Sequence, residues 1–185
     1  DLPSPLREVG FEQKLGEQVP LDLPFVDSEG NEVLLGDYFH EERPVVLALV
    51  YYECPILCSM VLGGLTSSLD VLTFDPGTDY EVVVVSFDPG ETPELASLKR
   101  ANTLDQLGRE GAGKGIHFLT GQPSSIDALT SAVGFSYTYD EVNRLRFYTN
   151  ADPVGRRGYR EIDVGPENET YAAFSPLPNF SVGYN

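Results

Sequence analysis

The feature that most constrains the fold is an unbroken apolar run that leads directly into two cysteines. Residues 45–52 read VVLALVYY, in which β-branched and aromatic side chains are frequent. A run of this length and composition is typical of a strand that is buried on both faces of a sheet. Cys54 and Cys58 follow the run closely, so they are expected where this strand meets the next element.

A helix is expected to begin at the cysteines. Pro55 suits the first turn of a helix, where the backbone N–H that proline lacks is not needed. Apolar residues then recur at helical spacing, namely Leu57, Met60, Val61, Leu65, Leu69 and Leu72. The cysteines are four residues apart, about one helical turn, so both sulfur atoms can face the same side.

The rest of the chain continues this alternation of strands and helices. The predicted elements are strands at residues 80–87 and 117–119, helices from Pro93 and from a cap at Ser124 or Ser125 to Gly134, and two hairpins, one with arms 23–26 and 33–35 and one with arms 135–139 and 144–149. Strands that alternate with helices imply parallel pairing through right-handed crossovers. We therefore predict an α/β, thioredoxin-like fold: a central mixed sheet flanked by helices, with an N-terminal hairpin extension and an atypical C-terminal end whose completeness the sequence leaves open.

The charge distribution divides the chain. The formal net charge is −17, yet residues 144–185 carry five basic and five acidic residues and so contribute none of it. This C-terminal part is also rich in glycine, proline and tyrosine. We predict an N-terminal extension at residues 1–20, a thioredoxin-like domain at 21–149 and an atypical tail at 150–185 that is irregular or weakly β.

Composition also restricts the class of protein. A strongly acidic surface repels phosphate backbones, which argues against nucleic-acid binding. No apolar run has the eighteen or so residues that a membrane span needs, and the first ten residues lack the basic start and apolar stretch of a signal peptide. Either the protein is cytosolic, or the numbering begins after a removed signal or anchor. Two cysteines are too few for a disulfide scaffold, and their proximity indicates redox or metal chemistry.

The cysteine pair is the candidate site. The partial positive charge at a helix N-terminus favours the thiolate of Cys54 over the thiol, which makes it a better nucleophile and metal ligand. Two soft thiolates one turn apart suit Cu(I), or Cu(II) with a further nitrogen ligand. They can also close a disulfide if the start of the helix is distorted, and the remaining interpretation is a pair of structural core cysteines. Structural zinc needs four protein ligands, and two cysteines with two distant histidines do not form such a set.

Three other residues are weaker candidates. His117 opens its strand, whereas the motif follows the end of its own, so in a parallel sheet His117 should lie away from the cysteines; we interpret it as structural. His40 is expected on the surface. Asp88, followed by proline, ends the second buried strand at the motif's edge of the sheet, where it either shapes the site or simply forms a turn.

The residues around the cysteines resemble a known family. Residues 45–65, VVLALVYYECPILCSMVLGGL, closely resemble the Sco/SenC family of thioredoxin-like copper-handling proteins. Further segments match in the same order: LGDYF at 35–39, VVSFDP with ETP at 84–93, HFLTG at 117–121 and residues 126–139. The resemblance extends over roughly residues 8–140.

The resemblance implies a periplasmic protein, or one on the outer face of the inner membrane, whose signal or anchor is absent from this chain. It implies that Cys54 and Cys58 bind copper, and that the partner is the copper-centre subunit of cytochrome c oxidase. The protein would deliver copper to the binuclear centre of that subunit, reduce its cysteines, or do both. That would make it a metallochaperone rather than an enzyme, with thiol–disulfide oxidoreductase activity left open.

One family residue does not carry over. The family's third copper ligand is a histidine in a strand after the segment that matches residues 135–139, and here the stretch 144–150 reads RLRFYTN. The sequence therefore leaves three interpretations: a copper-binding assembly factor, a thiol–disulfide oxidoreductase that uses Cys54 and Cys58 without stable copper, and an inactive remnant that lacks the third ligand.

Overall fold

The computed structural model describes residues 10–40, 42–53, 57–139, 145–150 and 159–163. The chain divides into two compact units, one of residues 11–135 and the other of residues 1–10 with 136–185. The predicted boundaries at residues 20 and 149 remain predictions.

The larger unit is built on one mixed sheet. Its strands are β2 (Pro24–Asp27), β3 (Glu32–Leu34), β4 (Val45–Val50), β5 (Glu81–Ser86) and β6 (Ile116–Thr120). They lie in the order β3-β2-β6-β5-β4. β4, β5 and β6 are parallel, whereas β2 runs antiparallel to both β3 and β6. The sheet is thus mixed, with parallel and antiparallel pairs, as the sequence predicts.

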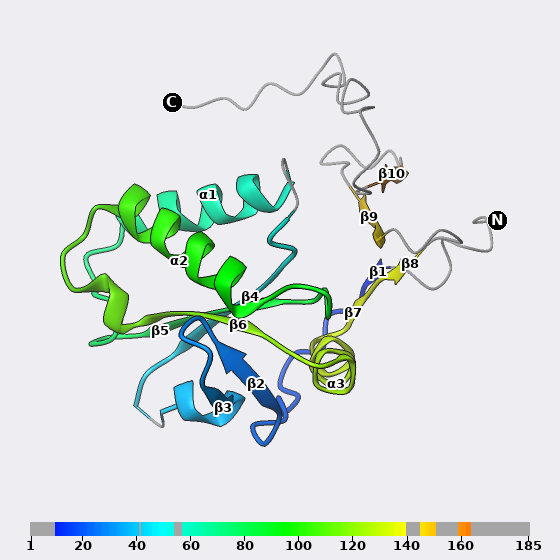
Figure 1. Cartoon of the computed structure of the whole chain (residues 1–185), viewed down its shortest axis with the longest axis horizontal. Helices are drawn as coiled ribbons and strands as arrows, with labels where there is room; N and C mark the ends of the chain where they lie inside the picture. The colour runs from blue at the N-terminus through cyan, green and yellow to red at the C-terminus, as the bar shows by residue number, and fades with distance from the viewer. Residues whose placement is uncertain (1–9, 41, 54–56, 140–144, 151–158, 164–185) are drawn as a thin grey trace, which may run out of the picture. The chain divides into compact units, whose positions relative to one another are not determined.

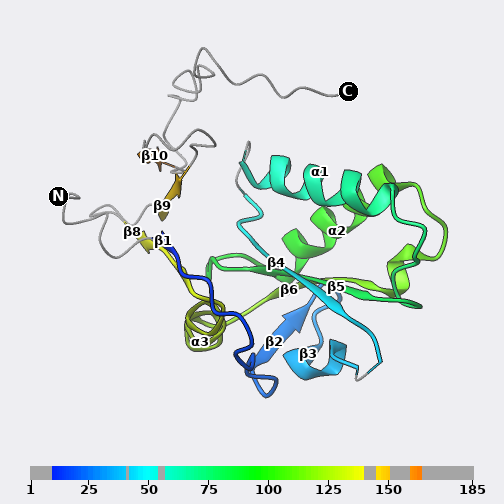
Figure 2. The ribbon, with the colours of Figure 1, turned by 180° about the vertical axis from the view of Figure 1, so that it is seen from behind.

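Helices cover the sheet. They are α1 (Leu57–Asp70), α2 (Pro93–Leu107) and α3 (Pro123–Val133), with short 3-10 turns η2 (Leu35–Tyr38) and η3 (Ala112–Lys114). α1 and α2 lie side by side on one side of β4, β5 and β6, and α3 lies on the other side (Figures 1 and 2). The connections β4–α1–β5 and β5–α2–β6 are the parallel crossovers expected from the sequence.

The ends of two helices show how local sequence sets their limits. The Thr92 hydroxyl caps α2 by accepting the Leu95 N–H, and Pro93 occupies the first turn. α3 starts two or three positions earlier than expected, because Pro123 takes the first turn and Gln122, rather than Ser124 or Ser125, is the N-cap. The predicted cap at Ser124 or Ser125 is therefore wrong. Gly134 ends α3 with a φ of 74°, a left-handed conformation that favours glycine.

Burial differs between the two apolar strands. Every residue of β5 is buried, and the side chains of Val82, Val83 and Val84 are fully enclosed. The prediction that the strand of residues 45–52 is buried on both faces is wrong for most of its length. Within β4 only Val50 is buried, and Val46 is 38% exposed. The reason is position, since in the described part of the chain β4 pairs with β5 alone and forms one edge of the sheet.

The smaller unit contains a separate three-stranded sheet. Its strands β8 (Thr138–Tyr139), β9 (Leu145–Asn150) and β10 (Tyr159–Asp163) lie in the order β10-β9-β8 and are antiparallel. The expected hairpin is present, but its first arm is confined to β8. Residues 135 and 136 form β7 (Phe135–Ser136), which pairs with β1 (Gly10–Phe11). Residues 151–158 and 164–185 of the predicted tail lie outside the described residues.

None of the helices in the described segments is long and apolar enough to cross a bilayer.

Candidate functional site

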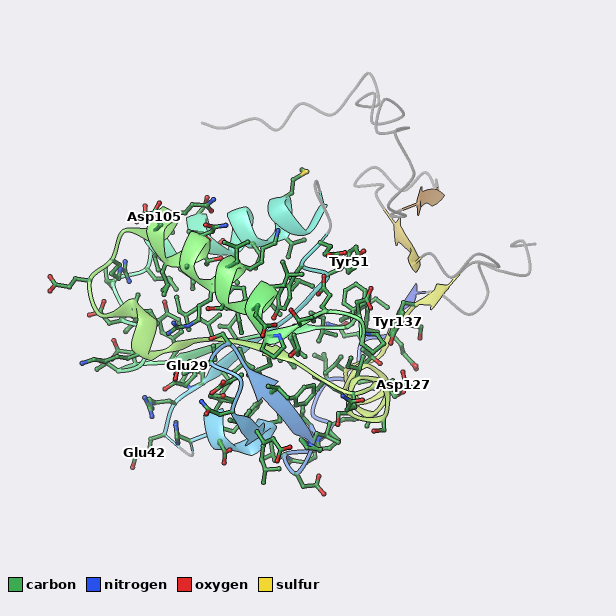
Figure 3. The ribbon with its side chains drawn as sticks, viewed as in Figure 1. Glu29, Glu42, Tyr51, Asp105, Asp127 and Tyr137 are labelled. Carbon is green, nitrogen blue, oxygen red and sulfur yellow. The ribbon has the colours of Figure 1, made fainter. Side chains whose placement is uncertain are left out.

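The candidate site lies where the three parallel strands end. The register aligns Val50 of β4 with Ser86 of β5, and Val85 of β5 with Leu119 of β6. The segments that leave these strands therefore emerge at one edge of the sheet, which is where open α/β sheets place their ligands. Tyr51 marks this end of β4 in Figure 3.

The two cysteines belong to the connection between β4 and α1. Cys58 is the second residue of α1. Cys54, like Pro55, lies outside the described residues, four positions after the last residue of β4. The predicted strand-to-helix junction is present around them, and the role of the two sulfur atoms remains a prediction.

Tyr52 anchors the chain just before the cysteines. Its side chain is fully buried, and its ring stacks on that of Phe118 with 5.7 Å between the ring centroids. The hydroxyl lies 2.8 Å from the carbonyl oxygen of Leu119 and 3.1 Å from that of Val84, and it donates its single hydrogen to this pair. Burial, and then the charge of Glu91, raise the pKa of Tyr52 well above its usual value, so the hydroxyl stays protonated and available as a donor.

Glu91 holds the backbone that leads into Cys54. The Tyr52 N–H donates to Glu91 Oε2 at 2.9 Å, and the Glu53 N–H donates to Oε1 at 2.6 Å. The Ser86 hydroxyl donates a short hydrogen bond to Oε2. One carboxylate thus fixes two successive peptide groups of the β4–α1 connection and is itself fixed from the end of β5.

The burial of this carboxylate has an electrostatic cost. Glu91 is only 8% exposed, and desolvation raises its pKa, while the hydrogen bonds from Ser86, Tyr52 and Glu53 work in the opposite direction. The two peptide N–H groups can only donate, and together with the donating Ser86 hydroxyl they favour the ionised carboxylate.

The turn after β5 presents Glu91 to the site. The Asp88 N–H donates to the Ser86 hydroxyl oxygen at 3.1 Å, and the Asp88 carboxylate accepts the Gly90 N–H at 2.7 Å. The Glu91 N–H then donates to the Asp88 carbonyl at 3.2 Å. Asp88 therefore forms a turn, one of the two roles expected for it from the sequence.

The histidines take other positions. His117 lies in β6 opposite Val83, and Val83 lies opposite Leu47, seven residues before Cys54. Its Nε2 is 3.0 Å from Glu81 Oε2, and its ring centroid is 4.4 Å from that of Tyr38. Burial lowers the pKa of His117, against the opposing influence of Glu81. His117 is thus engaged near the start of the parallel strands, as expected, and His40 is exposed.

No group of three or more His, Cys, Asp or Glu side chains in the described segments is arranged to hold a metal ion. Cys54 lies outside those segments.

Comparison with known proteins supports the fold. No family profile and no curated protein matches the chain. A solved protein of Aquifex aeolicus VF5, provisionally named an electron transfer protein, is 27% identical with a TM-score of 0.56, covering 72% of this chain and 80% of its own. The chain has a thioredoxin-like fold.

Sco proteins, the family that the sequence resembles, are among the solved structures similar to this chain. Arabidopsis thaliana ScoI with copper bound is 16% identical with a TM-score of 0.49, covering 76% of this chain and 74% of its own. BsSco, described as a member of the Sco family of cytochrome c oxidase assembly proteins, is 18% identical with a TM-score of 0.46, covering 88% of this chain and 93% of its own.

Glu91 is the residue of the site that sequence reasoning missed. In the sequence it stands out only as the first residue of the ETP segment that matches the family. The available signal was its place, because it follows the Asp88 turn at the end of a buried strand, at the same edge of the sheet as the cysteines.

Proposed function

We propose that this protein is a copper-binding assembly factor that acts through Cys54 and Cys58 on the binuclear copper centre of cytochrome c oxidase. The observation that carries the proposal is the position of the cysteine pair. In the chain, Cys54 follows the last residue of β4 by four positions, and Cys58 is the second residue of α1. The resemblance of residues 45–65 to the Sco/SenC family supplies the partner, and with it a periplasmic location or one on the outer face of the inner membrane.

In this proposal copper is cargo. A thiolate is favoured at a helix N-terminus, and two thiolates are soft ligands that suit Cu(I). Delivery is then a ligand exchange, in which the thiolates of the target replace those of Cys54 and Cys58 and Cu(I) keeps its oxidation state.

A second candidate is a thiol–disulfide oxidoreductase. It is favoured by the engagement of His117 with Glu81, which leaves the cysteines without that histidine as a third ligand. The Cys54 thiolate would attack a target disulfide, form a mixed disulfide and release one target thiolate. The Cys58 thiolate would then attack the Cys54 sulfur, release the second target thiolate and leave a Cys54–Cys58 disulfide. The inactive remnant stays a third alternative, which measured copper binding or thiol exchange would exclude.

The test is a Cu(I) titration of the fully reduced chain against a competing chelator. We expect uptake of about one copper per chain by the wild type and its loss in the Cys54→Ser, Cys58→Ser double variant. Equal uptake by both proteins would contradict the copper function. Oxidation of the wild-type cysteine pair in a glutathione buffer, without copper uptake, would favour the oxidoreductase instead.

A further inference from the structure

A buried carboxylate, that of Glu91, receives three hydrogen bonds, two of them from the residues just before Cys54 in the chain. Glu91 is 8% exposed, and its two oxygens accept the N–H groups of Tyr52 and Glu53 and the hydroxyl of Ser86. A carboxylate without charged partners costs free energy to bury. The described contacts of Glu91 include no cation, so its hydrogen bonds are what offset that cost.

These hydrogen bonds act on one short piece of chain. β4 ends at Val50, and the pairing of its backbone with β5 ends there, with the Phe87 N–H donating to the Val50 carbonyl at 3.0 Å. After Val50, the carboxylate of Glu91 accepts the hydrogen bonds of two consecutive peptide N–H groups, those of Tyr52 and Glu53. The second of these, in Glu53, belongs to the residue bonded covalently to Cys54.

We propose that Glu91 is a positioning residue for the cysteine pair, whose buried carboxylate holds the two peptide groups before Cys54 and thereby stabilises the Cys54–Cys58 disulfide. The inference rests on the proposed function only in requiring that the two cysteines exchange electrons. Closing the disulfide oxidises two thiols and releases two protons and two electrons, which oxidised glutathione accepts to form two reduced glutathione molecules.

One physical effect gives the proposal a direction. Because the peptide groups of Tyr52 and Glu53 are held by Glu91, the chain that leads into Cys54 has less conformational freedom to lose when the disulfide closes. Removal of the Glu91 carboxylate frees this chain and so weakens the disulfide.

The test compares the glutathione equilibrium of the wild type with that of Glu91→Gln. The variant keeps the shape of the side chain, but its amide NH₂ group replaces one carboxylate oxygen and cannot accept the hydrogen bond from the backbone N–H that faced that oxygen. We expect its disulfide equilibrium constant to fall about tenfold, a rise of about 30 mV in potential for a two-electron couple. Glu94→Gln makes the same charge change three residues further along, at a fully exposed position, and should stay within about twofold of the wild type.

Two further measurements keep the proposal open to refutation. Ser86→Ala removes one donor to Glu91, and should shift the constant in the same direction by a smaller factor. In the wild type, hydrogen exchange of the Tyr52 and Glu53 amides should be slow. A folded Glu91→Gln protein with an unchanged equilibrium constant would overturn the proposal, even if its melting temperature fell. If Glu91→Gln does not fold, an unchanged constant in Ser86→Ala or fast exchange of the two amides would do so.

The outcome is separable from that of the copper function. A wild type that takes up no Cu(I), but whose disulfide depends on Glu91, would contradict copper handling and support the positioning role. Copper uptake by the wild type, together with a disulfide equilibrium constant that Glu91→Gln does not change, would support copper handling and contradict the positioning role.

Discussion

Replacement of Tyr52 by phenylalanine isolates one buried hydroxyl beside the candidate site. The Tyr52 hydroxyl donates to the carbonyl oxygens of Leu119 and Val84, at 2.8 and 3.1 Å, from a side chain with no exposed surface. Phenylalanine preserves the stacking on Phe118 and removes only this donor. The net contribution of one such hydrogen bond is about 1 kcal/mol, so Tyr52→Phe should lower the free energy of unfolding by about that amount. For a chain of this size the melting temperature falls by about 2–4 °C.

Tyr80 provides a matched control with the opposite expectation. It is also buried, at 5% exposure, but its hydroxyl has no hydrogen-bond partner in the part of the chain that the structure describes. Tyr80→Phe removes a buried polar group without breaking a bond. The result should lie between no change and a stabilisation of about 1 kcal/mol.

The assay is thermal and urea unfolding of the reduced full chain at neutral pH, followed by far-ultraviolet circular dichroism. Tyr52→Phe should be less stable than the wild type, and Tyr80→Phe should not. Equal destabilisation by both substitutions would refute the reasoning, because it would mean that loss of the hydroxyl matters irrespective of its partners.

Three further expectations concern His117 and Arg43, the two residues that pair with Glu81. Cu(II) should bind weakly, and its paramagnetic resonance spectrum should be the same in the wild type and in His117→Ala, because His117 lies away from the cysteines. A nitrogen coupling in the wild-type spectrum that disappears in His117→Ala would contradict this expectation. Burial lowers the pKa of His117 in the folded chain, so as the pH falls below about 6.5 the unfolded chain binds a proton at this histidine first and the folded state loses stability. Between neutral and acidic pH, the urea midpoint should therefore fall less for His117→Asn than for the wild type. Arg43→Met removes the 2.6 Å ion pair with the buried Glu81, and at 26% exposure of Arg43 should cost about 2 kcal/mol in urea unfolding. Asp75→Asn, at a carboxylate that is 67% exposed in its pair with Arg109, should cost less than about 1 kcal/mol. Equal costs would show that burial of Glu81 plays no part.

Local signals predicted most of the larger unit. The turn at residues 27–31 and the flanking apolar pairs identified β2 and β3, and the run of valines identified β5, because turn chemistry and unbroken apolarity depend only on neighbouring residues. The start of α3 was missed because proline at the first turn outweighed the serines as caps.

Burial and the architecture of the site were harder to predict. β4 has the composition of a buried strand, but its exposure is decided by which strands pair with it, a long-range property that its own residues do not encode. The same holds for Glu91, whose three donors come from segments up to 39 residues away in sequence. The sequence predicted that His117 lies away from the cysteines, because parallel strands place their C-terminal ends at one edge of the sheet and His117 lies near the start of β6.

The most direct test of the central claim is X-ray absorption at the copper edge of the Cu(I)-loaded, reduced chain. If Cys54 and Cys58 hold the metal together, the spectrum should show two sulfur neighbours for each copper. The Cys58→Ser variant, which keeps Cys54, should lose one of them. Fewer than two sulfur neighbours in the wild type, or a spectrum unchanged in the variant, would contradict the account.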